Sequence, residues 1–227
     1  MTTDEARLRT EICHWGKSMF DRGLTFGSSG NLSARLADGF LVTPTNSCLG
    51  FLEPAHLSKL DPDGRHLSGD APTKEVPLHL AVYRARPQAM GIVHLHSSYA
   101  TAISCLEDID PEDAIPAVTP YVVMRVGRVP ILPYTRPGST EIADLVLAKA
   151  PEHAAFLLAN HGPVVSAKSF VDAVFAAEEL EETAKLVLLT SSHKKRCLTS
   201  DAIRDLSHRM VHPADKRVTD PAKSTDS

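Results

Sequence analysis

Aromatic side chains are scarce in this sequence of 227 residues, where one Trp, four Tyr and seven Phe make up 5% of the chain. The core must therefore be largely aliphatic, and the 43% of hydrophobic residues are enough to build one. No apolar run approaches the roughly 20 residues that a membrane-spanning helix needs. The N-terminal stretch carries acids early and has no apolar signal segment. We therefore expect no membrane partner and a cytoplasmic protein.

Charge and cysteine content exclude further classes of protein. The 28 acidic residues outnumber the 24 basic ones and give a net charge of −4, so no overall basic field suggests nucleic acid as a partner. The four cysteines, Cys13, Cys48, Cys105 and Cys197, lie far apart and form no CxxC pair. This pattern favours reduced, mostly buried thiols in the cytoplasm over a disulfide framework.

Hydrophobic periodicity predicts helices interleaved with many short strands. The expected helices cover residues 4–22, about 74–86, about 98–106, 139–150, 168–191 and 200–211. The expected strands lie within 27–36, 40–45, 90–97, 121–127, 129–134, 154–159 and 163–167. A chain of this length leaves little room for two domains. We expect one α/β domain over residues 1–212 and a polar, flexible tail over 213–227.

Two histidines one residue apart suggest a metal site. His94 and His96 fall in a strand-like segment, so their rings should project from one face while Leu95 points into the core. Such a pair is also common on strands without metal. Catalytic zinc usually takes three protein ligands and keeps one position open, and His161, in an Asn-His-Gly turn after a buried strand, is the best third candidate. Most of the other eight histidines are expected at the surface, with two of them on predicted helices, His14 and His79.

Glu75 lies in the first turn of the helix that Pro72 and Thr73 are expected to open. One interpretation is local: an acid there stabilises the helix dipole and Thr73 caps the helix. The other is functional, because a helix N-terminus can direct its carboxylate, hydroxyls and free N–H groups into a site and can bind a phosphate. The segment alone does not separate these interpretations.

Two hydroxyl-rich clusters favour an anionic substrate. Residues 27–31, GSSGN, offer backbone N–H groups and small hydroxyls, although no GK[ST] follows and such a segment is often only a turn. Thr43, Thr45, Asn46 and Ser47 form a second cluster at a strand end. Together with a helix N-terminus, in a chain with a metal site, they indicate a phosphorylated substrate.

Five motifs, in order along the chain, resemble the class II aldolase/adducin-like family, which includes fuculose-phosphate aldolase and ribulose-phosphate 4-epimerase. They are Gly30-Asn31, Thr43-Pro44-Thr45, Thr73-Lys74-Glu75, His94-Leu95-His96 and Asn160-His161-Gly162. The resemblance covers about residues 5–210. It implies a single domain with a mixed central sheet between helix layers, assembled as a C4 tetramer with active sites between subunits.

The resemblance also implies a set of site residues. One Zn²⁺ per subunit would be held by His94, His96 and His161, a ligand set that also suits Mn²⁺ or Co²⁺. Glu75 would be the acid/base carboxylate and would also approach the metal when substrate is absent. The positions that match the family's phosphate site are Asn31, Thr43, Thr45 and Thr73.

Longer segments resemble a branch of the family that converts a 3-oxo-tetronate 4-phosphate to dihydroxyacetone phosphate and CO2 in acid-sugar catabolism. These segments cover residues 43–50, 67–75, 119–127, 157–165 and 178–186. Aldolases typically have a small hydroxyl residue before the glutamate, where this chain has Lys74. Lys74 would hold the substrate carboxylate or phosphate, or it is an ordinary exposed helix lysine. The last tyrosine is Tyr134, so the C-terminal tyrosine of aldolases and epimerases is missing.

Decarboxylation of a 3-oxo acid requires that the electrons left behind be held as an enolate, which a Lewis-acidic cation at the 3-oxo oxygen would stabilise. The resemblance places the family's catalytic tyrosine at Tyr121, the expected proton donor, on its own or a neighbouring subunit. An aromatic residue that merely begins a strand is the competing interpretation. Glu75 would exchange protons with the substrate.

Two alternative functions remain at this point. An aldolase would cleave a ketose phosphate to dihydroxyacetone phosphate and an aldehyde. A non-catalytic adducin-like scaffold often lacks the metal ligands, whereas this chain has Glu75 and all three histidines. The acidic run Glu178–Glu182 is interpreted as a solvated or inter-subunit helix face.

Overall fold

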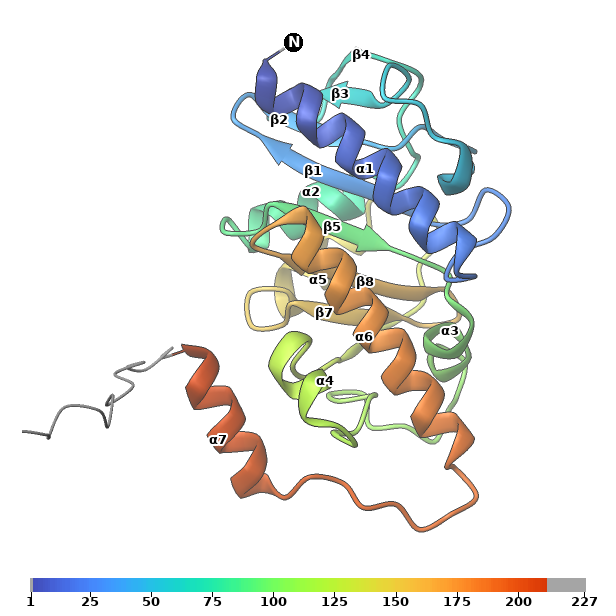
Figure 1. Cartoon of the computed structure of the whole chain (residues 1–227), viewed down its shortest axis with the longest axis vertical. Coiled ribbons are helices and arrows are strands. Elements are labelled where there is room, and N and C mark those ends of the chain that lie inside the picture. Colours follow the sequence, from blue (N-terminus) through green and yellow to red (C-terminus); the bar gives the residue numbers. More distant parts are fainter. Residues whose placement is uncertain (1, 212–227) are drawn as a thin grey trace, which may run out of the picture.

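One mixed β-sheet forms the centre of the molecule, and the computed structural model describes it within residues 2–211 (Figure 1). In this part of the chain the sheet has eight strands in the order β4-β3-β2-β1-β5-β8-β7-β6. Neighbouring strands are antiparallel except β6 and β7, which are parallel. The strands are β1 (Asn31–Leu36), β2 (Gly39–Val42), β3 (Ser58–Leu60), β4 (His66–Ser68), β5 (Gly91–His94), β6 (Ile131–Leu132), β7 (Ala155–Leu158) and β8 (Gly162–Ala167).

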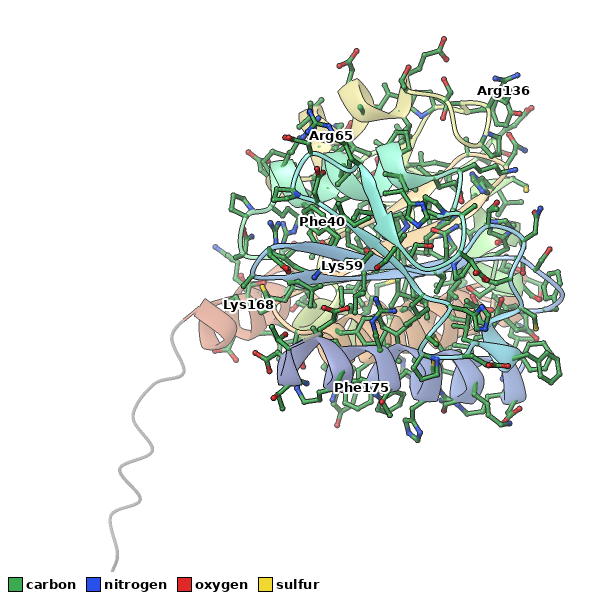
Figure 2. All side chains as sticks on the ribbon, turned by 90° about the horizontal axis from the view of Figure 1, so that it is seen from above. Phe40, Lys59, Arg65, Arg136, Lys168 and Phe175 are labelled. Atoms are coloured by element: carbon green, nitrogen blue, oxygen red, sulfur yellow. The ribbon has the colours of Figure 1, made fainter. Side chains whose placement is uncertain are left out.

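Helices cover both faces of the sheet. In Figure 1, α1 and α6 cross its front face, and α2 and α5 lie behind it. Figure 2 shows Phe40 and Phe175 on opposite sides of the sheet. Phe40 stacks on Tyr83 of α2, whereas Phe175 of α6 meets the ring of Trp15 from α1 edge-on. The helices are α1 (Thr3–Asp21), the short 3-10 helix η1 (Leu49–Phe51), α2 (Val76–Ala85), α3 (Ser98–Ser104), α4 (Pro120–Arg125), α5 (Ile142–Lys149), α6 (Phe170–Leu189) and α7 (Ser200–Val211). The predicted α/β domain with a mixed sheet between helix layers is confirmed.

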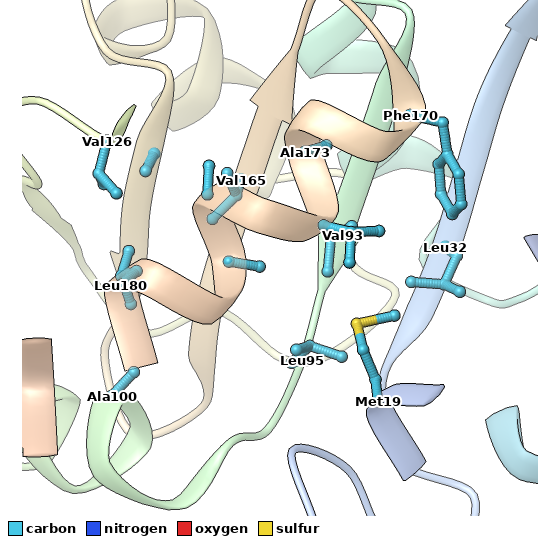
Figure 3. Close-up of a cluster of buried hydrophobic side chains, with 14 of the residues drawn as sticks. Met19, Leu32, Val93, Leu95, Ala100, Val126, Val165, Phe170, Ala173 and Leu180 are labelled. Atoms are coloured by element: carbon cyan, nitrogen blue, oxygen red, sulfur yellow. The ribbon is translucent and has the colours of Figure 1, made fainter. Parts of the chain in front are cut away.

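The core is aliphatic, as the composition predicts, and the sheet divides it in two. On the front face, side chains of α1 and α6 such as Met19 and Leu180 pack on the strands, where Leu32 and Val93 are fully buried (Figure 3). On the back face, α2 and α5 cover the sheet with their own buried residues. Burying each such side chain contributes about 1.5–3 kcal/mol, so both helix layers are held firmly against the sheet.

The prediction of a strand over residues 121–127 was wrong, because most of this segment belongs to helix α4. The Thr119 side chain accepts a hydrogen bond from the backbone N–H of Val122, and Pro120 occupies the first helical turn. A Thr cap followed by Pro starts a helix even where β-branched residues follow. The strand expected over 129–134 shortens to Ile131–Leu132. Two consecutive valines thus carried less weight than the capping residues before them.

Three further expectations concern the chain as a whole. The predicted tail over residues 213–227 lies outside the described residues. In the part of the chain that the structure describes, no helix is both long and apolar enough to cross a bilayer. All four cysteines are free thiols, as predicted, but the expectation that most are buried was wrong, because Cys13 and Cys48 are only partly buried and Cys105 and Cys197 are exposed.

Candidate metal centre and active site

Four side chains from three separate segments converge beside strand β5. One possible ligand atom from each of Glu75, His94, His96 and His161 lies within 4.8 Å of the others. Glu75 and His94 are buried, and His96 and His161 are partly buried. The structure therefore brings together the three histidines and the carboxylate that the sequence pointed to. Their role as metal ligands stays a prediction.

The spacing of the ring nitrogens fits a single small cation. The Nε2 atom of His161 lies 3.3 Å from Nε2 of His94 and 3.1 Å from Nε2 of His96. Two ligands at 2.0–2.1 Å from a tetrahedral zinc are about 3.3 Å apart, so these separations are those of neighbouring ligands on one ion. Neutral imidazole nitrogens facing each other this closely need a proton or a cation between them. Three imidazoles and a carboxylate are a donor set that zinc accepts readily.

The strand ladder and one tight turn place the three rings. His94 is the last residue of β5, and its ring Nδ1 lies 2.9 Å from the carbonyl oxygen of Pro163 on β8. A carbonyl only accepts, so Nδ1 carries a proton, and Nε2 is the nitrogen that faces the centre. His96 lies two residues beyond the strand, so the strand argument applies directly only to His94. Leu95 is fully buried in the front core, as expected.

His161 reaches the centre because β7 reverses tightly into β8. Asn160 has a φ of 56°, a left-handed conformation that Asn tolerates better than most residues. Gly162 follows at φ +152°, and a Cβ there would lie 2.3 Å from the carbonyl oxygen of Leu95. Only glycine allows this close approach, which brings the turn against the backbone next to His94 and His96.

A carboxylate from helix α6 holds the segment that follows His96. Glu181 accepts hydrogen bonds from the Ser97 hydroxyl at 2.7 Å and from the backbone N–H groups of Tyr99 and Ala100 at 2.9 Å each. It thus caps the N-terminus of α3 and fixes the chain just past the last strand residue. The interpretation of Glu178–Glu182 as a purely solvated or inter-subunit face was wrong for Glu181. The sequence offered no signal for this contact, since 84 positions separate Ser97 and Glu181.

Glu75 enters the site from the end of helix α2. The helix begins at Val76, so Glu75 lies one residue before the first turn in which it was expected. Glu75 occupies the N-cap position, but its side chain does not cap the helix. Its carboxylate accepts a hydrogen bond from Asn31 at 2.7 Å and lies 3.3 Å from His94. The Thr73 hydroxyl accepts from the backbone N–H of Glu75. The geometry therefore favours the functional interpretation of Glu75 over a local one.

Burial and charge act in opposite directions at the centre. Burial alone would raise the pKa of Glu75, but the charge of His94 and hydrogen bonds from His94 and Asn31, with the charge of His161, hold the pKa well below its usual range. Burial would lower the pKa of His94, but the Glu75 carboxylate raises it. Burial and the charge of His94 lower the pKa values of His96 and His161 to about 4. These two rings are therefore neutral at pH 7, the form in which imidazole binds a metal.

A pocket of about 750 Å³ opens onto three of the four groups, Glu75, His96 and His161, whereas His94 is fully buried. Its lining includes Asn31, Thr45, Thr73 and Lys74, four of the five residues expected to bind the substrate or its phosphate. Residues 27–31 and Asn46 line it as well, so both hydroxyl-rich clusters face one cavity. Lys74 also contributes to lowering the pKa values of His96 and His161, so its charge acts on the centre. Sequence reasoning assigned no binding role to several other lining residues, among them Thr101 and Asn160.

Two expected site residues lie elsewhere in this chain. Thr43 is buried, and its hydroxyl accepts a hydrogen bond from the backbone N–H of Leu32, so it does not line the pocket. Tyr121 lies on α4 with 57% of its surface exposed and borders two other cavities. Its ring does not line the pocket at the four groups, so a role for it there stays a prediction that requires a neighbouring subunit.

One of the eight histidines left outside the predicted metal site, on a predicted helix, is buried beside that site. His79 on α2 is 1% exposed, and its Nε2 lies 2.5 Å from the Asn31 side-chain oxygen. The sequence did contain a signal for it. Glu75, His79 and Tyr83 recur every four residues on the helix, and Asn31 and Ser33 alternate on a strand, so two polar faces can meet.

The comparisons with known proteins agree with this architecture. A family model described as Class II Aldolase and Adducin N-terminal domain matches residues 10–188. The chain belongs to the class II aldolase and adducin family. Within this family it is 52% identical over 206 residues to a Pectobacterium atrosepticum protein named 3-oxo-tetronate 4-phosphate decarboxylase, covering 90% of this chain and 94% of that one.

More distant members of the family have another activity in their names. An L-fuculose phosphate aldolase of Escherichia coli is 34% identical over 186 residues, covering 81% of this chain and 84% of that one. Among solved structures, the class II aldolase fold recurs in YgbL from Klebsiella pneumoniae, with a TM-score of 0.87, 49% identity, and coverage of 91% of this chain and 99% of that chain. The fold expected from the five motifs is thus confirmed, and the family is the one that they resemble.

Proposed function

We propose that this protein is a metal-dependent carboxy-lyase that decarboxylates a 3-oxo-tetronate 4-phosphate to dihydroxyacetone phosphate and CO2. The observation that carries the proposal is the 52% identity to the Pectobacterium decarboxylase over nearly the full length of both chains. Identity to the Escherichia coli aldolase is 34% over a smaller share of each chain. Lys74, where aldolases typically have a small hydroxyl residue, favours the same choice.

The metal would be held by His94, His96 and His161, whose ring nitrogens face one another within ligand spacing. Zinc fits this donor set best, and Mn²⁺ or Co²⁺ also suit it. A divalent cation bound there supplies Lewis acidity that stabilises negative charge on the oxygens of the substrate. The Pro163 carbonyl places the proton of the His94 ring on Nδ1, and Glu181 fixes the backbone directly after His96.

The reaction breaks the bond between C1 and C2 of the substrate. C1 leaves as CO2, the electron pair enters an enediolate across C2 and C3, and one proton is then added at C2 to give dihydroxyacetone phosphate. Glu75 is ionised in the folded protein, so it can hold a proton from a substrate hydroxyl and return it. Asn31 keeps the carboxylate in place through its amide N–H.

The substrate's anionic ends would be bound along the pocket wall. Thr45 and Thr73 supply hydroxyls, and the turn over residues 27–31 supplies hydroxyls and backbone N–H groups. Lys74 is a cation within this wall, beside Glu75, and it would pair with the substrate carboxylate or phosphate. Thr43 would act indirectly, because its buried hydroxyl holds the strand that carries Asn31.

Tyr121 would donate the final proton from a neighbouring subunit. It borders no part of the pocket in its own chain, and its exposed ring on α4 is free to contact another copy. This assignment requires a homo-oligomer, and we propose the C4 tetramer that the family resemblance implies, with active sites between subunits. The free thiols favour a cytoplasmic location.

Product analysis tests the proposal directly. The metal-loaded protein is incubated with a 3-oxo-tetronate 4-phosphate, and released CO2 and dihydroxyacetone phosphate are measured, with L-fuculose 1-phosphate as the control substrate. We expect equimolar CO2 and dihydroxyacetone phosphate from the first and no aldehyde from the second. Aldehyde release without CO2 would identify an aldolase instead. Purified protein without stoichiometric metal and without either activity would point to a scaffold.

A further inference from the structure

A buried row of polar side chains runs from the active-site carboxylate into the back layer of the fold. Glu75, His79 and Tyr83 follow one another at four-residue intervals along α2, and Asn31 and Ser33 alternate along β1. Side chains four apart on a helix and two apart on a strand have similar spacing, so the two rows interleave. Burial is almost complete, since none of the five residues is more than 6% exposed. The proposed reaction uses only Glu75 and Asn31 of this row.

Each contact in the row is a hydrogen bond between buried groups. The Asn31 amide nitrogen lies 2.7 Å from the Glu75 carboxylate, and the Asn31 oxygen lies 2.5 Å from Nε2 of His79. The Nδ1 atom of His79 lies 2.7 Å from the Ser33 hydroxyl, which lies 3.0 Å from the Tyr83 hydroxyl. Every polar group in the row therefore has a partner, as buried polar groups require.

The chemistry of the groups determines which partner donates in each hydrogen bond of the row. An ionised carboxylate only accepts, so Asn31 presents its NH2 group to Glu75 and its oxygen to His79. His79 must then carry its proton on Nε2, which leaves Nδ1 to accept from the Ser33 hydroxyl. Ser33 in turn accepts from Tyr83. Burial and the charge of His94 lower the pKa of His79 to about 3, so the ring is neutral and has a single proton to donate.

We propose that His79 is a positioning residue that sets the orientation of the Asn31 amide and, through it, the Glu75 carboxylate. Without the Nε2 proton, the Asn31 oxygen loses its donor, and only the Glu75 carboxylate still distinguishes the two ends of the amide. In the flipped orientation its oxygen would face the carboxylate and repel it. Glu75 would then turn away from the position in which it meets the substrate hydroxyl. This inference rests on the proposed function for the role of Glu75, but the hydrogen-bond direction is independent of it.

Two variants separate positioning from simple core filling. His79→Leu fills similar space but cannot donate, whereas His79→Gln can still donate a hydrogen bond to the Asn31 oxygen. For His79→Leu we expect kcat to fall about 10- to 100-fold, the usual effect of losing a supporting partner. KM and metal content should stay near those of the unmodified protein. His79→Gln should regain most of the lost kcat, and Tyr83→Phe, at the far end of the row, is the matched control with little loss.

A readout that does not need activity is the tautomer of His79, measured by ¹⁵N NMR on the metal-free and metal-loaded protein. We expect the Nε2–H form in both. An Nδ1–H tautomer would overturn the inference whatever the activity of the variants, and so would a folded His79→Leu protein with unchanged kcat. If the unmodified protein released no CO2, the proposed function would fail. The tautomer of His79 would still show which partner donates in the hydrogen bond between His79 and Asn31. Should His79→Leu not fold, the tautomer and the Gln variant decide instead.

Discussion

The Nε2 atoms of His96 and His161 lie 3.1 Å apart, although 65 positions separate these residues in the chain. One residue follows the end of a central strand and the other lies in a reversal between two strands of the same sheet. Their rings meet because β5 and β8 are neighbours in the sheet, which puts the end of one beside the start of the other. The proposed metal centre is therefore a consequence of strand order, and the predictions below start from it.

Removal of one imidazole should remove the metal. His161→Ala leaves only two of the three proposed histidine ligands, and we expect bound zinc to fall to background after dialysis, with loss of CO2 release. His193→Ala, an exposed histidine outside the site, is the control and should keep full metal content. The measurement is metal analysis of the purified proteins. Stoichiometric zinc in His161→Ala would mean that the metal, if any, is held elsewhere.

Glu75→Gln should separate metal binding from turnover. The amide keeps an oxygen that can accept from Asn31 but cannot take up a proton, so we expect kcat to fall about 10²- to 10⁴-fold. Zinc content should remain at the level of the unmodified protein because the three histidines are intact. Steady-state kinetics with parallel metal analysis checks both parts. Turnover at the normal rate would remove the acid/base role from Glu75.

Glu181 should support the metal centre from a distance. Its carboxylate takes three hydrogen bonds from the segment directly after His96, and Glu181→Gln can accept only some of them. We expect zinc affinity to fall about 10- to 100-fold, as is usual when a supporting partner is lost. Glu182→Gln is the matched control, since that side chain is 61% exposed and pairs with Lys185 on its own helix. Equal affinities of the two variants in a chelator competition would contradict the role.

Tyr121 should act on a site of another subunit. Tyr121→Phe and His96→Ala should each be inactive alone, for different reasons. In mixed tetramers that reassemble at random from equal amounts, about a quarter of the sites would pair an intact metal centre with an intact tyrosine in a closed ring. Activity recovered by co-refolding the two inactive proteins would be the positive result. No recovery, with tetramers confirmed by light scattering, would exclude a tyrosine shared between subunits.

The stability of the metal-free protein should depend on pH through His79. The charged groups that act on its ring are His94 and Glu75, and Tyr83 shares the Ser33 hydroxyl with it. Burial and the charge of His94 lower its pKa to about 3, whereas an unfolded histidine has a pKa near 6.5. Between these values the unfolded state binds a proton that the folded state does not. This contribution to stability is therefore complete above pH 6.5 and is lost as the pH falls toward 3.

The size of this effect can be measured by comparison with His79→Gln. One such group lowers the free energy of unfolding by about 2 kcal/mol between pH 7 and pH 5. Urea unfolding of the metal-free proteins at both pH values should show this extra loss in the unmodified protein only. The other titrating groups are common to both proteins and cancel. Parallel pH profiles would show that His79 is protonated in the folded state.

Part of the site could be found in the sequence because its residues lie in short local patterns. The His-x-His pair, the Asn-His-Gly turn and the glutamate at a helix start each specify a local geometry. Alternation along a strand and the position of a helix start then indicate which way these side chains point. The same logic failed for residues 121–127, where consecutive valines favoured a strand. The cap made by Thr119 and the proline after it decided for a helix.

The sequence by itself determined the fold class, the aliphatic core and the identity of the four groups at the centre. Only the tertiary structure decided that His79 is buried, that Glu181 accepts hydrogen bonds from the segment after His96, and that Tyr121 lies away from the pocket of its own chain. These three facts depend on contacts between elements far apart in sequence. Such contacts follow from the order of strands in the sheet and the packing of helices on it, and no local pattern of side chains encodes that order.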